Sequence, residues 1–83
     1  MHSFRFQRPI VVTAHARRRM EERSISDALL VELIETGDTR HRDATHLWVF
    51  KEFANRQDNM LCAVLVIEDV LVVKTVMHHF SLS

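Results

Sequence analysis

Residues 60–77 carry the sequence MLCAVLVIEDVLVVKTVM, in which two nearly continuous apolar runs are separated by Glu68-Asp69. Short apolar runs rich in valine, leucine and isoleucine are typical of central strands that are buried on both faces. The acidic pair predicts a tight turn, so residues 60–67 and 70–77 should form two neighbouring antiparallel strands. Cys62 lies in the first run, where we expect a buried and unreactive thiol.

A second hairpin is predicted just before these strands. Residues 39–42 and 45–53 should pair around Asp43-Ala44, and residues 54–59 form a polar turn. Trp48 and Phe50 lie on the second strand of this hairpin. Exposed aromatic side chains on a sheet stack on bases in RNA-binding proteins, but packing beneath helices is the commoner arrangement and the one we expect.

Two helices are predicted in the first half of the chain. Thr13 is a good N-cap for a helix over residues 14–23, and Ser26 is a good N-cap for another over residues 27–36. Apolar residues recur in the second segment with helical spacing. Gly37 should end this helix in the left-handed conformation that commonly follows a helix.

The first residues of the chain add only an extended lead-in. Residues 10–13 form a β-branched run after Pro9, and the alternation in residues 4–6 fits an edge strand or a partner-binding arm. The fold class that follows is α+β. Two N-terminal helices should pack on one face of an antiparallel sheet of three to four strands, in a single domain spanning residues 1–83.

The composition is that of a globular chain with an uneven distribution of charge. Apolar residues make up 47% and charged residues 27%, so disorder is not expected. Residues 1–23 hold six arginines and two glutamates, whereas residues 24–83 hold five basic and nine acidic residues. This asymmetry fits a basic patch for a phosphate backbone, or a contact between the two halves of two copies. No signal peptide and no apolar run of the roughly 18 residues of a membrane span is present, so we expect a cytoplasmic protein with no membrane partner.

The first predicted helix carries the most informative polar residues. His15, Arg19 and Arg23 are each one helical turn apart, so they lie in one row. An imidazole transfers protons near neutral pH, and guanidinium groups bind phosphate oxygens and stabilise the charge on a pentavalent phosphorus. The row therefore suits metal-independent RNA cleavage, in which a 2′-hydroxyl attacks the adjacent phosphate. The alternative is a solvated face of mixed charge, with Arg18 and Glu22 as an i,i+4 pair.

Further candidate site residues lie outside this row. His78 is the best candidate for a second proton-transfer group, because acid–base cleavage needs both a donor and an acceptor. The phosphate-binding candidates are Arg18, Lys51 and Lys74. The lysines would contact phosphate from the sheet face opposite the helices, or would simply be solvated, and Thr75 should point away from Lys74 if the strand is regular.

Several kinds of site are not expected. His41 and His46 do not form a zinc-binding spacing with His78-His79, and adjacent histidines on a strand point to opposite faces, so we predict no metal. The chain has no glycine-rich phosphate loop, no Ser-His-Asp order and no paired-carboxylate site. We therefore expect no cofactor, and we exclude kinases, dehydrogenases and hydrolases of the familiar kinds. A DNA-binding regulator is disfavoured because the second helix is acidic.

The pattern T-x-H-A-x-x-R-M-x-E-R-x-I-S in residues 13–26 resembles the opening motif of a bacterial family of small domains of unknown function. The segment VKTV in residues 73–76 resembles the closing strand of that family, and the resemblance extends over about residues 10–78. Ser24 departs from the motif, which would have glycine after the arginine.

The resemblance implies kinship with the RelE/ParE-like toxin superfamily, which includes small mRNA interferases and gyrase-directed toxins on a fold of a helix pair and a sheet. Many of its members pair with a co-encoded antitoxin. The expected function is therefore a toxin-like, metal-independent endoribonuclease or an RNA-binding protein of a toxin–antitoxin system, with RNA and an antitoxin as partners. His15, Arg19, Arg23 and His78 would be its catalytic residues. The alternative is a non-catalytic protein-interaction module that forms a homodimer.

Overall fold

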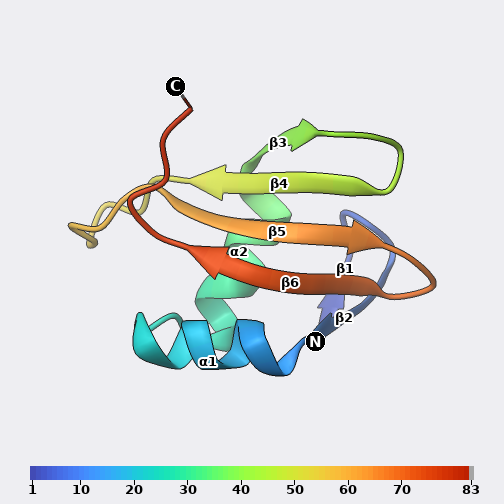
Figure 1. Cartoon of the computed structure of the whole chain (residues 1–83), viewed down its shortest axis with the longest axis horizontal. Helices are drawn as coiled ribbons and strands as arrows, with labels where there is room; N and C mark the ends of the chain where they lie inside the picture. The colour runs from blue at the N-terminus through green and yellow to red at the C-terminus, as the bar shows by residue number, and fades with distance from the viewer. Residues whose placement is uncertain (83) are drawn as a thin grey trace.

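The architecture is that of a computed structural model, which describes residues 1–82. Six strands form one mixed sheet in the order β1-β2-β6-β5-β4-β3, curved into a half-barrel, and two short helices lie against it (Figure 1). In chain order the elements are β1 (His2–Ser3), β2 (Arg8–Val12), α1 (Ala14–Glu22), α2 (Asp27–Thr36), β3 (Asp38–His41), β4 (His46–Lys51), β5 (Leu61–Ile67) and β6 (Leu71–Met77).

The predicted architecture of two helices on an antiparallel sheet of three to four strands is wrong. β2 lies where only an extended lead-in was expected, and it pairs in parallel with β6, from Ile10 opposite Leu71 to Val12 opposite Val73. β1 then adds an antiparallel edge strand to β2. A two-residue strand has no periodicity to detect, and no local pattern in β2 reveals a parallel partner near the other end of the chain. The molecule is therefore richer in strands than its sequence predicts.

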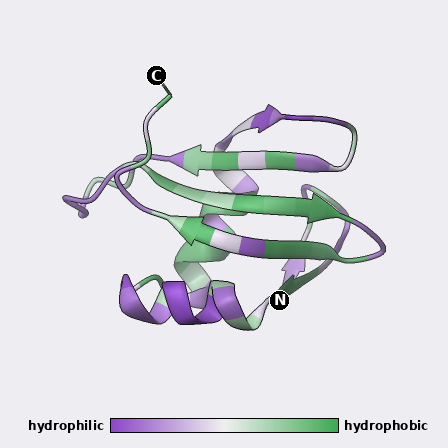
Figure 2. Ribbon diagram, in the orientation of Figure 1, coloured by the Kyte–Doolittle hydropathy of each residue, from purple (hydrophilic) through white to green (hydrophobic). Residues whose placement is uncertain are grey.

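The two hairpins are confirmed. β3 and β4 pair antiparallel from Asp38 opposite Phe50, and β5 and β6 pair antiparallel around the turn at Glu68-Asp69. Cys62 on β5 is fully buried, and this burial raises the pKa of its thiol to about 12. Figure 2 shows β5 as the strand that is hydrophobic over most of its length, as expected for the centre of the sheet.

Both predicted helix starts are confirmed by their caps. The Thr13 hydroxyl accepts the N–H of Ala16 at 3.1 Å, and the Ser26 hydroxyl accepts the N–H of Leu29 at 3.1 Å. Each cap satisfies one of the N–H groups that the first turn of a helix leaves unpaired.

Gly37 ends α2 for a different reason from the predicted one. Its φ is −73°, which is not left-handed. A Cβ at this position would lie 2.6 Å from the carbonyl oxygen of Leu33 and 2.7 Å from Cγ2 of Val49. The glycine is therefore needed because the end of α2 approaches β4 too closely for any side chain.

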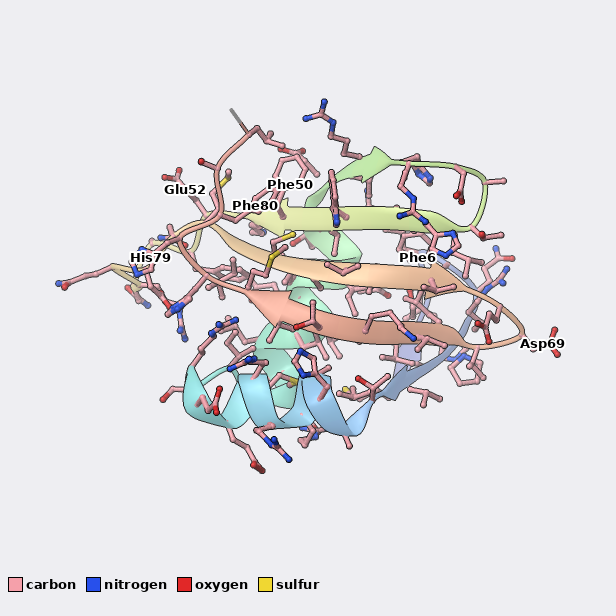
Figure 3. The ribbon with its side chains drawn as sticks, in the orientation of Figure 1. Phe6, Phe50, Glu52, Asp69, His79 and Phe80 are labelled. Carbon is pink, nitrogen blue, oxygen red and sulfur yellow. The ribbon has the colours of Figure 1, made fainter. Side chains whose placement is uncertain are left out.

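The core lies between the helices and one face of the sheet. Leu30, Leu33 and Ile34 of α2 are fully buried, as are the residues of β4–β6 that alternate toward the helices. Figure 1 shows α2 crossing behind the sheet, so the face toward the viewer is not covered by a helix. Phe80 of the C-terminal segment lies on that open face beside Phe50 (Figure 3), with 5.6 Å between the ring centroids. Among residues 1–82, no helix has the length and apolarity needed to span a membrane.

Candidate functional site

The edge of β6 that faces α1 is where several of the predicted site residues lie. β2 pairs with β6 only as far as Val73, and the chain then enters α1, which continues beside β6 (Figure 1). The Thr13 hydroxyl donates to the carbonyl oxygen of Lys74 at 3.1 Å, and the Arg23 guanidinium donates to that of Val76 at 2.5 Å. Because the start of α1 contacts Lys74 and its end contacts Val76, the helix follows β6 in the same direction. We call this region the α1–β6 edge and define it by His15, Arg19, Arg23, Lys74 and His78.

A bulge in β6 shapes the middle of this edge. Thr75 pairs with Val64 and Val73 pairs with Leu65, so Lys74 has no partner on β5. Val73 and Val76 are both buried, whereas Lys74 is exposed. Lys74 and Thr75 therefore both leave the core, and the regular alternation expected for this strand is wrong. Bulges commonly redirect side chains in this way near functional sites.

His15 lies at the start of α1, against this bulge. Its Nε2 is 3.1 Å from the hydroxyl oxygen of Thr75, and its side chain is otherwise exposed. The hydroxyl can donate to or accept from the ring, so this contact fixes the position of the imidazole but not its tautomer. No hydrogen bond within residues 1–82 involves Nδ1 of His15.

The arginines of α1 have different surroundings. Arg19 pairs with Glu22 at 2.8 Å, so the acidic partner expected for Arg18 is used by Arg19 instead. Both side chains of this pair are more than 40% exposed, and exposed pairs contribute little, about 0–1 kcal/mol, so an anion can compete for Arg19. Arg23 holds β6 through one N–H, and Arg18 is exposed on the solvent side of α1.

His78 follows β6 and is held by a carboxylate. Its Nδ1 is 3.1 Å from Oδ2 of Asp58, and the histidine side chain is 34% exposed. Arg56 forms a bidentate pair with the same carboxylate, with both N···O distances at 2.8 Å. The Arg56 guanidinium and then the His78 imidazole hold the pKa of Asp58 well below its usual range. An ionised carboxylate only accepts hydrogen bonds, so Nδ1 of His78 carries the proton and Nε2 is left for a ligand or for proton transfer.

Arg56 also joins this cluster to α1. It donates to the carbonyl oxygens of Arg23 at 2.6 Å and Ser24 at 3.0 Å, which are the free acceptors at the C-terminal end of the helix. A guanidinium there is favoured by the unpaired carbonyl groups and by the helix dipole. The polar turn, the end of α1 and His78 therefore form one connected network.

A family comparison covers almost all of this site. The model of the family described as Domain of unknown function (DUF4258) matches residues 12–78. The chain belongs to this family. No curated protein and no solved structure matches the chain significantly. The DUF4258 match runs from the last residue of β2 to His78, so it includes the whole α1–β6 edge and leaves out β1 and the segment after His78.

Not every predicted residue of this DUF4258 domain reaches the site. Lys51 lies on the α2 side of the sheet, where its Nζ donates to the hydroxyl of Thr36 at 2.6 Å and lies 3.8 Å from Glu32. His15 and His78 both lie along β6 but toward opposite ends of α1, and eight residues of helix rise by about 12 Å. Within residues 1–82, no three or more His, Cys, Asp or Glu side chains are grouped to hold a metal ion.

Arg56 and Asp58 are the site residues that sequence reasoning missed. They lie in a polar turn, where charged residues are ordinary, and Asp58 is 20 residues before His78. Asp58 and His78 are brought together only by the pairing of β5 with β6, because Asp58 precedes β5 and His78 follows β6. The register of the predicted hairpin was the one feature of the sequence that could have indicated the contact.

Proposed function

We propose that this protein is a toxin-like endoribonuclease that binds RNA at the α1–β6 edge and cleaves it without a metal ion. The observation that supports this best is the alignment of His15, Arg23 and His78 along one strand edge, with His78 held by Asp58. Two imidazoles can serve as the proton acceptor and the proton donor of acid–base cleavage, and the guanidinium groups of Arg19 and Arg23 can bind the phosphate.

The proposed chemistry is a transfer within the RNA strand. The 2′-oxygen attacks the adjacent phosphorus and the bond from phosphorus to the 5′-oxygen breaks, which leaves a 2′,3′-cyclic phosphate and a 5′-hydroxyl. Since His15 and His78 lie toward opposite ends of α1, the phosphate would lie between them and both side chains would turn toward it. One histidine then takes the proton of the 2′-hydroxyl, and the other gives a proton to the departing 5′-oxygen. Arg19, Arg23 and Lys74 would stabilise the negative charge that builds on the phosphorus.

Asp58 has a defined part in this scheme. Its carboxylate accepts a hydrogen bond from the Nδ1–H of His78, so Nε2 is the nitrogen that exchanges a proton with RNA. The carboxylate also stabilises the imidazolium that forms when Nε2 is protonated. Asp58 is thus a positioning residue in the proposal.

Kinship with the RelE/ParE-like toxins and pairing with a co-encoded antitoxin belong to the same proposal. The pattern in residues 13–26 supports both, since it carries His15, Arg19 and Arg23. A short DNA-binding protein encoded beside this chain would add support.

The test is RNA cleavage in EDTA by purified wild type and by three alanine variants. H15A and H78A should each lose at least about 100-fold in rate, the usual contribution of one proton-transfer group. H41A is the matched control, because His41 is an exposed histidine on β3 outside the α1–β6 edge. The proposal fails if wild type and H15A are equally inert, or if they are equally active.

A second candidate function, a homodimeric interaction module, is favoured by one observation. Phe4 is 82% exposed on a loop that is otherwise fixed, because the Glu35 carboxylate accepts hydrogen bonds from the Ser3 hydroxyl at 2.7 Å and the Phe4 N–H at 2.6 Å. A rigid exposed aromatic residue is a common anchor in protein interfaces. Light scattering after gel filtration tests this: a dimer that F4A converts to a monomer supports the module, and a monomeric wild type refutes it.

A further inference from the structure

A pocket lies on the sheet face opposite α2, at the end of the β3–β4 hairpin. It is small, with a cavity volume of about 50 Å³, and it is lined by Arg42, His46, Leu47, Trp48 and Val64. Trp48 and Val64 are cross-strand partners on neighbouring strands, and the buried residues Leu47 and Val49 alternate toward the helices. None of the residues that define the α1–β6 edge lines this pocket, so the two sites are distinct, although both are open to the same side of the sheet.

The polar side of this pocket is formed by His46, whose imidazole is positioned by Asp43. Nδ1 of His46 is 2.9 Å from Oδ1 of Asp43, and the same oxygen accepts the backbone N–H groups of Thr45 at 2.9 Å and His46 at 2.8 Å. These contacts, led by the N–H of Thr45, hold the pKa of Asp43 well below its usual range. The ionised carboxylate can only accept, so Nδ1 carries a proton, and in the neutral ring Nε2 of His46 is then an acceptor. No hydrogen bond of the described residues uses that Nε2.

The apolar side of the pocket is formed by the indole of Trp48, which Phe80 contacts. Phe80 packs against Trp48 with 6.3 Å between the ring centroids, in the segment that Figure 3 shows over the open face. Val64 of β5 lies beside Trp48 in register. Arg42 adds a guanidinium at the rim that is 69% exposed and 3.8 Å from Asp43. An indole, a directed acceptor and an exposed guanidinium suit a planar ring that carries N–H groups and has a phosphate beside it.

We propose that this pocket binds a nucleobase of single-stranded RNA, with the base stacked on Trp48, its edge donating to Nε2 of His46, and a neighbouring phosphate on Arg42. The inference rests on the proposed function and names the form of its substrate. A base that stacks on an indole must be unstacked from its neighbours, which excludes a paired strand.

The sheet connects this pocket to the α1–β6 edge. Trp48 pairs with Val64, Val64 pairs with Thr75, and Thr75 contacts His15. Neighbouring strands are about 4.8 Å apart, so Trp48 and Thr75 are separated by about 10 Å. An RNA strand that crosses the open face can therefore place one base in the pocket and a phosphate at the edge.

The single tryptophan makes this testable by fluorescence. Wild type is titrated with a ten-nucleotide 2′-O-methyl RNA of mixed sequence, which lacks the attacking hydroxyl, while tryptophan emission and the anisotropy of a labelled copy are recorded. The expected result is saturable quenching of Trp48 at the concentration at which anisotropy rises. W48L should weaken binding by about 5- to 150-fold, the range for one stacked base. H46A and R42A should also weaken it, whereas H41A on the same hairpin should not.

The outcomes separate this inference from the proposed function. RNA binding with unchanged Trp48 emission, and with R42A as tight as wild type, overturns the pocket but leaves the α1–β6 edge standing. Quenching by adenosine or uridine monophosphate at the concentration that suffices for the ten-nucleotide RNA overturns RNA as the ligand and assigns a free nucleotide. Quenching by the RNA together with full cleavage by H15A supports the pocket and refutes the proposed catalytic edge. R42A changes an exposed side chain, so it keeps the test decisive if W48L does not fold.

Discussion

Replacing Ser24 by glycine should stabilise the fold. Ser24 has a φ of 54°, in the left-handed region, and it follows Arg23, the C-cap residue of α1. The N–H of Ser24 donates to the carbonyl oxygen of Glu21, and the N–H of Ile25 donates to the carbonyl oxygen of Met20. This pair of bonds is the Schellman motif that ends a helix. Glycine reaches this conformation without a steric penalty.

The magnitude follows from two opposing terms. A residue with a Cβ costs about 1–2 kcal/mol in the left-handed helical region. Glycine gives back about 0.5–1 kcal/mol through the greater entropy of the unfolded chain. At the middle of the two ranges, about 1.5 and 0.75 kcal/mol, the net gain for S24G is about 0.75 kcal/mol. For a chain of this size, 1 kcal/mol shifts Tm by about 4–8 °C, so the expected rise is roughly 3–6 °C.

The assay is thermal and urea unfolding followed by far-ultraviolet circular dichroism. S24A is the matched control, because it keeps the Cβ and removes a hydroxyl that forms no hydrogen bond among residues 1–82. We expect S24A to change the free energy of unfolding by less than about 0.5 kcal/mol. A Tm for S24G below that of wild type, or an equal rise in S24A, would refute the argument from backbone conformation.

The remaining predictions concern stability and its pH dependence. G37A should lower the free energy of unfolding by about 2–3 kcal/mol, because the new Cβ would lie 2.6 Å from the Leu33 carbonyl oxygen; an unchanged urea midpoint would contradict the close approach. T13A removes both the cap of α1 and its bond to β6, so it should cost about 1–2 kcal/mol in the same assay. Asp58 has a pKa lowered by Arg56, so its contribution is present above the unfolded-state pKa of about 3.9 and is lost as the pH falls through the folded-state value. D58N should thus be less stable than wild type by about 1–2 kcal/mol at pH 7, and this gap should shrink below about pH 4; an equal gap at pH 7 and pH 3 would refute the pairing.

Local chemistry was enough to predict the elements whose determinants are adjacent in the sequence. Thr13 and Ser26 cap their helices because each hydroxyl lies three residues before the N–H that it accepts. The turn at Glu68-Asp69 follows from polar residues between two apolar runs. In each case the partner of the residue is fixed by the chain itself, so a short stretch of sequence contains the answer.

The features that could not be predicted depend on pairing across the chain. The role of β2 is decided by β6, some 60 residues later, and Lys51 lies on the α2 side because its strand alternates from Leu47 and Val49. The contact of Asp58 with His78 has the same origin. In the row on α1, His15 contacts Thr75 and Arg23 contacts Val76, so the surroundings of the row are supplied by residues that lie 60 and 53 positions later in the chain.

The α1–β6 edge exists because β2 is short. If β2 continued past Val12, it would pair with the rest of β6, and the carbonyl oxygen of Val76 could not accept from Arg23. Since β2 stops there, α1 takes its place and brings His15 to Thr75. The bulge at Lys74 lies just beyond the last pair of β2 with β6, so the strand can turn two successive polar side chains away from the core without breaking a ladder on that side. The position of the proposed site is thus set by the point at which the parallel pairing of β2 with β6 ends.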